Sequence, residues 1–145
     1  VCNDVTEDEY DEALLIAGFM KDTLKSKIGA VGLAANQVAI MSRIIIVKLN
    51  MQYKIMINPT IIAQDNIATA REECLSLPRL SISIPRYSKI TIEYLDDKLC
   101  KQELNLSGFS ARLVLHEIDH LNGKTLLDYK TKRRSLLSII KEFFS

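Results

Sequence analysis

Residues 43–64 read RIIIVKLNMQYKIMINPTIIAQ, a succession of short β-branched runs separated by turn residues. This pattern is typical of antiparallel strands with short connections. It returns in KITIEYL (89–95) and KQELNL (101–106), with Asp96-Asp97 between them as an expected hairpin turn. The sequence therefore predicts a strand-rich middle from Arg43 to Glu103.

Helical patterns flank this middle region. The first runs from about Glu7 to Lys25, where Thr6 and Glu9 have the spacing of a capping box. A second runs from about Phe109 to Leu121 and stops at Asn122-Gly123, and a third runs from about Arg134 to Phe144. The apolar stripe expected to pack the first helix against the core comprises Leu15, Ile16, Phe19, Met20 and Leu24. Short turns rather than crossover helices join the strands, which predicts the α+β class.

Composition narrows the classes of function. The chain has 145 residues, 48% of them hydrophobic, so residues 1–145 are expected to form a single domain. A formal net charge of +1 argues against direct binding of nucleic acid. No apolar run is long enough to span a membrane and the start does not resemble a signal peptide, which predicts a cytoplasmic protein without membrane contact. Three cysteines are an odd number, which argues against a disulfide framework.

The motif with the clearest chemistry is HEIDH at 116–120, which contains both histidines of the chain. On a helix His116 and His120 lie one turn apart and can hold one metal ion, with Glu117 beside them as a candidate general base. Phe109 and Leu113 lie at helical spacing and are expected to bury this face, which makes a merely exposed pair of histidines a poor explanation.

A catalytic metal site of this kind usually takes a third protein ligand. No other histidine exists, so the candidates are Cys, Asp or Glu. Cys74 is the best of these because it lies in EECLSLP, a polar break between strand patterns. Cys2 is expected at a frayed end, and Cys100 lies in a strand-like segment.

Three blocks together resemble the peptide deformylases, metal-dependent amidases that remove the formyl group from N-formylmethionine. AVGLAANQ (30–37) is similar to the family's GxGLAAxQ, EECLS (72–76) to EGCLS, and HEIDH (116–120) to HExDH. Smaller agreements lie between and beside them, namely INP (57–59), Pro85-Arg86 and GFSAR (108–112). The fold that this implies is one of antiparallel β-sheets packed around a central, metal-binding HExxH helix, with an N-terminal and a C-terminal helix.

The resemblance implies a role for each matching residue. Cys74, His116 and His120 would bind one divalent metal ion per chain, and metal-bound water would be the nucleophile with Glu117 as general acid and base. The Gln37 side chain and the Leu75 backbone N–H would stabilise the oxyanion. The family suggests Fe(II), whereas the residues alone are equally compatible with Zn(II), Ni(II) or Co(II).

The expected substrate is an N-formyl-methionyl peptide, the start of a nascent chain at the ribosome. Small residues around Gly32 would let the backbone of the substrate peptide approach closely and pair with the protein as an added strand does. Val31, Phe109 and Leu113 are placed to line a pocket for the methionine side chain.

The sequence departs from the family at Ala30 and Glu73, where glycine is common, and at Leu115, where glutamine is common. Glu73 adds a charge beside the expected metal, which is expected to affect peptide preference rather than the chemistry. The strand that usually precedes the first helix has no expected counterpart. Two alternatives stay open at this point: a metal hydrolase acting on other acyl groups, and a related binding protein without activity.

Overall fold

The computed structural model describes residues 1–74 and 77–129, and its centre is one five-stranded antiparallel sheet. Each strand pairs with the next along the chain, in the order β1-β2-β3-β4-β5. Among the described residues, helices α1 and α2 and two short 3-10 helices accompany the sheet, and residues 126–129 form a further helical turn. The bounds are η1 Glu7–Glu9, α1 Tyr10–Lys25, β1 Gly32–Ala34, η2 Ala35–Val38, β2 Ile44–Leu49, β3 Gln52–Cys74, β4 Leu77–Leu95, β5 Lys101–Ser107 and α2 Gly108–Leu121. The predicted α+β class is confirmed, whereas the helix expected from Arg134 to Phe144 lies outside the described residues.

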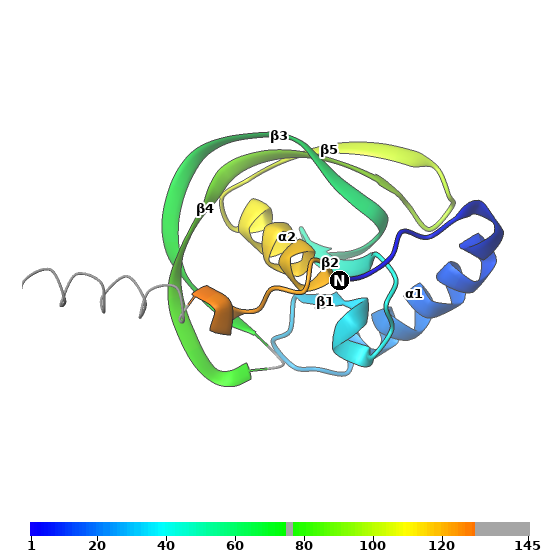
Figure 1. Cartoon of the computed structure of the whole chain (residues 1–145), viewed down its shortest axis with the longest axis horizontal. Coiled ribbons are helices and arrows are strands. Elements are labelled where there is room, and N and C mark those ends of the chain that lie inside the picture. The colour runs from blue at the N-terminus through cyan, green and yellow to red at the C-terminus, as the bar shows by residue number, and fades with distance from the viewer. Residues whose placement is uncertain (75–76, 130–145) are drawn as a thin grey trace, which may run out of the picture.

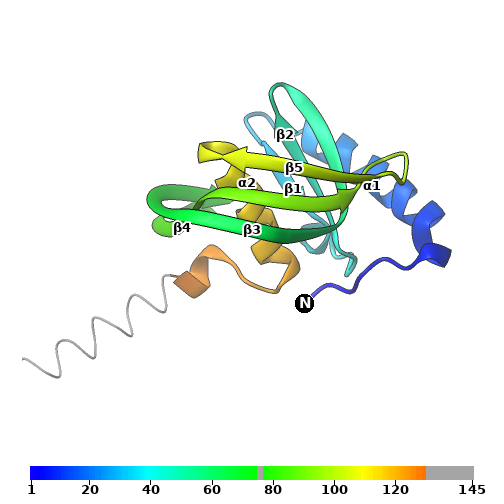
Figure 2. The same ribbon diagram turned by 90° about the horizontal axis from the view of Figure 1, so that it is seen from above.

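The strands β3 and β4 form one long, curved hairpin that arches over α2, with β5 alongside (Figures 1 and 2). The sequence pattern predicted separate short strands here, which is wrong, because β3 continues from Gln52 to Cys74. The register shifts between Ile57 and Thr60, where β3 leaves β2 and continues beside β4 alone. Pro59 cannot donate to a strand ladder, and a bulge accommodates it without ending the strand.

The strand β2 is buried on both faces, which explains its unbroken apolar run. Ile44 and Ile46 pack in the cluster that includes α1, whereas Ile45 and Val47 pack in the cluster that includes α2. Successive side chains of a strand point to opposite faces, so one short strand supports both helices. The helix α2 is thereby held between β2 and the arch of the long hairpin (Figure 1).

The face that α1 buries matches the predicted stripe in part: Met20 and Leu24 are buried and Ile16 is partly buried, but Leu15 and Phe19 point away from the core. Leu15 and Phe19 are 77% and 56% exposed. The buried residues of the helix are Ala13, Ala17, Met20 and Leu24. Ala13 and Ala17, which the predicted stripe left out, complete this face beside Met20 and Leu24. The expected start is confirmed, because the backbone N–H of Thr6 donates to Glu9 Oε1 at 3.1 Å.

The structure tests two further predictions, one about Cys2 at the start of the chain and one about the turn between β4 and β5. Cys2 is not at a frayed end: it is buried, and its backbone N–H donates to the Leu121 carbonyl at 2.8 Å. Asp96 makes the expected turn, and its Oδ1 accepts from the backbone N–H groups of Lys98 and Cys100 at 2.9 and 3.0 Å. Cys100 is exposed in that turn rather than paired in a strand. Within the described residues, neither helix is long and apolar enough to cross a bilayer.

Candidate metal centre and its cavity

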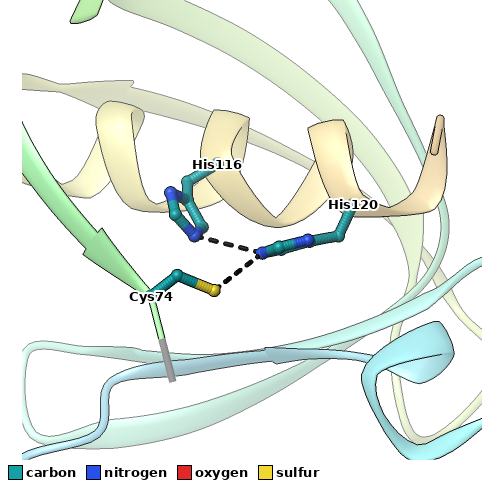
Figure 3. A group of neighbouring side chains, drawn as sticks. All are labelled: Cys74, His116 and His120. Carbon is teal, nitrogen blue, oxygen red and sulfur yellow. Dashed lines mark hydrogen bonds between the residues drawn. The ribbon is translucent and has the colours of Figure 1, made fainter. Parts of the chain in front are cut away.

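The end of β3 meets the middle of α2 at a cluster of three metal-binding side chains. One ligand atom each from Cys74, His116 and His120 lie within 4.8 Å of one another. The Nε2 atom of His120 is 3.2 Å from Cys74 Sγ and 3.2 Å from His116 Nε2 (Figure 3). All three residues are buried. Of the three cysteines, the structure thus brings to the histidines the one that the sequence favoured.

The chemistry of this donor set fits a divalent transition metal. One thiolate and two imidazoles are soft to borderline ligands, and three protein ligands leave a fourth position open for a reacting molecule. A second observation agrees with this fit. Glu117 Oε2 is buried and has no hydrogen-bond partner among the described residues, so a polar group belongs beside it.

Glu117 lies next to the cluster on α2, and the space around it depends on Gly32 of β1. The side chain is buried, and its burial raises the pKa of the carboxyl group to about 7. A Cβ on Gly32 would come within 2.8 Å of Glu117 Oε1 and within 2.8 Å of Leu113 Cδ1. Only glycine at position 32 therefore leaves enough space for the carboxylate of Glu117.

Gln37 is held beside the cluster by η2, directly after β1. Its Oε1 accepts a hydrogen bond from the backbone N–H of Ala34 at 2.8 Å, and its Nε2 donates to Cys74 Sγ at 3.5 Å. The neighbouring Asn36 donates from Nδ2 to the backbone carbonyl of His120. The turn after β1 is thus attached to the same part of α2. Leu75, the other expected oxyanion donor, lies outside the described residues.

Sequence reasoning missed a buried ionic network behind His116. Glu72 Oε1 accepts from His116 Nδ1 at 2.8 Å, which leaves His116 Nε2 directed toward the cluster. Arg86 donates to both Glu72 oxygens, from Nε at 2.5 Å and from Nη2 at 2.8 Å. Burial acts to raise the pKa of Glu72, but its hydrogen bonds with His116 and Arg86 outweigh burial and lower that pKa to about 2. Glu72 is therefore a charged carboxylate that fixes the ring of His116.

The network continues from Arg86 to α2 and beyond it. Arg86 Nη1 donates to Asp119 Oδ2 at 2.7 Å, and the Tyr129 hydroxyl donates to the same oxygen at 2.5 Å. Two features of the sequence could have indicated this buried network. Glu72 lies two residues before Cys74 and so shares its face of a strand, and the matching Pro-Arg pair supplies Arg86.

Arg112 connects the same network to the backbone of the long hairpin. Its Nη1 donates to Glu72 Oε2 at 2.6 Å and to the Ile84 carbonyl at 2.8 Å, and its Nη2 donates to the Ala68 carbonyl at 2.6 Å. Through its guanidinium group, Arg112 of α2 therefore holds both β3 and β4 in place over the helix.

A cavity of about 550 Å³ opens beside the cluster. Its lining includes all four residues expected to contact substrate, together with Gln37 and Glu117. Those four are Val31, Gly32, Phe109 and Leu113. Leu113 is buried as expected, but Phe109 is 68% exposed. The expectation that Phe109 buries the face of the motif is wrong, because it lies at the start of α2, where the helix projects to the solvent.

Comparison with known proteins places these features in context. Residues 1–135 match the family model described as "Polypeptide deformylase". The peptide deformylase of Endomicrobium trichonymphae is 39% identical over 131 residues, which cover 87% of this chain and 77% of that protein. The peptide deformylase of Orientia tsutsugamushi (strain Ikeda) is 44% identical over 114 residues, which cover 68% of this chain. That match spans only 63% of the Orientia protein's own length.

Solved structures agree with the fold. The crystal structure of peptide deformylase from Thermotoga maritima superimposes with a TM-score of 0.81 at 34% identity, over 88% of this chain and 86% of that one. That of peptide deformylase from Thermus thermophilus gives a TM-score of 0.83 at 30% identity, over 97% of this chain and 85% of that one. The similarity therefore extends to the arrangement of the elements that carry the cluster.

Proposed function

The chain belongs to the polypeptide deformylase family, and from this we propose that it hydrolyses the formyl group from N-formylmethionine at the start of newly made polypeptides. The observation that carries the proposal is the convergence of Cys74, His116 and His120 within 4.8 Å, beside a buried Glu117 and an open cavity. Since nascent chains would be the substrates, the proposed place of action is the cytoplasm, where they leave the ribosome.

Cys74, His116 and His120 would together hold one divalent cation, for which we propose Fe(II), with Zn(II), Ni(II) or Co(II) as substitutes. When bound, the cation supplies a Lewis acid that lowers the pKa of water toward ~7. Glu72 contributes from behind, because its hydrogen bond at 2.8 Å orients the ring of His116.

Glu117 is the proposed proton carrier. It would accept the proton of the attacking water and deliver it to the amine that leaves when the C–N bond of the formamide breaks. Two features support this role. Its Oε2 has no competing partner in the described part of the chain, and Gly32 leaves room beside its Oε1.

Gln37 is the proposed donor to the oxyanion that forms on the formyl carbonyl. Because the backbone N–H of Ala34 holds its Oε1, the Nε2 donor is oriented before substrate arrives. Such preorganisation avoids the cost of turning a dipole during the reaction. The backbone N–H of Leu75 is proposed as the second donor on the resemblance alone.

The cavity supplies the remaining requirements of the substrate. Val31, Leu113 and, at its exposed end, Phe109 offer apolar contacts for the methionine side chain. Gly32 offers a backbone that an extended peptide can approach closely, since it has no side chain.

The test is turnover of matched peptides by the metal-loaded protein. Formyl-Met-Ala-Ser should release formate, whereas acetyl-Met-Ala-Ser should not be cleaved, because the proposed site would admit a formyl hydrogen but not a methyl group. Equal cleavage of both peptides would favour a hydrolase of other acyl groups. Binding of the formyl peptide without turnover in every metal form would favour a binding protein.

A further inference from the structure

The cavity lies between the segment that leads into β1 and the end of β3. Ile28, Gly29, Ala30, Val31 and Gly32 line one side, and Arg71, Glu72, Glu73 and Cys74 line the other. In the described part of the chain, the end of β3 pairs only with β4, and β1 pairs only with β2. Gly32 at the start of β1 and residues 71–74 of β3 therefore present strand edges to the space between them, and an extended peptide fits this space.

Two charged side chains stand along the β3 wall. Side chains alternate along a strand, so the buried Glu72 and Cys74 alternate with the exposed Arg71 and Glu73. Glu72 is already engaged with Arg86 and Arg112. Arg71 and Glu73 take part in no salt bridge between described residues, and the facing wall of residues 28–32 contains no charged residue. Their charges are available to a bound molecule.

The order of these charges relative to the metal cluster is fixed by the strand. Glu73 is adjacent to Cys74, and Arg71 is two residues farther along β3, or roughly 7 Å. A peptide whose N-terminal group lies at the cluster passes Glu73 before Arg71. An extended peptide has the same rise per residue, so its side chains two positions apart match the separation of the two charges.

We propose that Glu73 and Arg71 select, among formyl-methionyl peptides, those with a basic residue shortly after the methionine and an acidic residue two positions beyond it. The inference rests on the proposed deformylase function and adds the charge order of its substrates. Both side chains are exposed, so each favourable contact should change kcat/KM about 2- to 5-fold. The change should lie mainly in KM, because both contacts are made to peptide side chains that take no part in the reaction.

The test uses isomeric substrates with the same composition and net charge. Metal-loaded protein is assayed with amidated formyl-Met-Lys-Ala-Glu and formyl-Met-Glu-Ala-Lys, and with the same pair carrying one extra alanine after methionine to cover the neighbouring register. We expect kcat/KM to favour the Lys-first isomer at least about 5-fold in one of the two pairs, since two contacts change sign together. The preference should diminish in about 0.5 M salt, where exposed charges are screened.

Variants separate these two charges from the rest of the cavity. The double exchange of Arg71→Glu with Glu73→Arg conserves net charge and should reverse the preference. The neutral double variant, Arg71→Gln with Glu73→Gln, should bring the ratio of kcat/KM for the two isomers close to one. This variant provides the test if the exchanged variant does not fold. Amidated formyl-Met-Ala-Ala-Ala gives the reference rate for each protein.

Two results would overturn the inference while leaving the proposed function intact. One is turnover of the alanine peptide with ratios under about 1.5 for both isomeric pairs. The other is a preference that persists in the neutral variant. No turnover of the alanine peptide by the metal-loaded wild type would overturn the proposed function, and this inference with it.

Discussion

The surroundings of the single residue Gly32 show how tightly the proposed site is packed. A methyl group there would meet Glu117 Oε1 and Leu113 Cδ1 at 2.8 Å each. We predict that Gly32→Ala removes most turnover and lowers the free energy of unfolding by about 1–3 kcal/mol, the usual cost of overpacking. Steady-state kinetics and urea denaturation would measure the two effects.

Gly18 provides a matched control within α1. A Cβ at that position would meet nothing within 4 Å. Gly18→Ala should therefore raise the free energy of unfolding by about 0.5–1 kcal/mol, because alanine is the better helix former, and should leave turnover unchanged. If both alanine variants behaved alike, the close approach at Gly32 would not be what requires glycine.

Between elements, Glu72 of β3 connects β4 and α2. It accepts from Arg86 of β4 and from Arg112 and His116 of α2. Glu72→Gln leaves the buried guanidinium of Arg86 and the partly buried one of Arg112 without their shared carboxylate. We predict a loss of about 3 kcal/mol in the free energy of unfolding and about 10- to 100-fold in metal affinity.

The exposed pair of Glu93 and Lys101 is the matched control for that prediction. It joins β4 to β5 at 2.8 Å, but Lys101 is 70% exposed. Glu93→Gln should lower the free energy of unfolding much less than Glu72→Gln does and leave metal affinity unchanged. Chelator competition would measure the metal affinity of both variants, and chemical denaturation would measure their free energies of unfolding. Equal losses of affinity and stability in the two variants would contradict a special role for the buried network.

The turn between β4 and β5 depends on the charge of Asp96. Burial acts to raise the pKa of Asp96, but hydrogen bonds from the backbone N–H groups of Cys100 and Lys98 together outweigh burial and lower that pKa. We predict that Asp96→Ala costs about 1 kcal/mol of unfolding free energy at pH 7. Because the folded pKa is lowered, this contribution is present above the unfolded pKa and is lost as pH falls through the folded value. Urea denaturation of both proteins at pH 7 and near pH 3 should show the difference shrinking, and a constant difference would contradict the account.

For the molecule as a whole, sequence alone predicted what is local. The spacing of His116 and His120, the turn at Asp96 and the ends of α2 depend on neighbours in the chain, and all three features are present as predicted. Cys74 was reachable by elimination among few candidates.

What the sequence did not predict depends on distant contacts. The continuity of β3 through Pro59 follows from pairing with β4 rather than from its own residues. Leu15 and Phe19 are exposed because α1 packs on the sheet through Ala13, Ala17, Met20 and Leu24, and the choice of that face depends on where the sheet lies. The partners of Glu72 come from residues 14 to 44 positions away, beyond the reach of any periodicity.

The most direct test of the central claim is the turnover of metal-replete Glu117→Gln on a formyl-Met peptide, with metal content measured in the same sample. Glu117 is not one of the three clustered ligands, so the variant should keep one metal ion per chain. It should nevertheless lose at least about 10²-fold in kcat, because glutamine cannot carry a proton. Near wild-type turnover with full metal content would contradict the account, and the cluster of Cys74, His116 and His120 would then be a structural metal site.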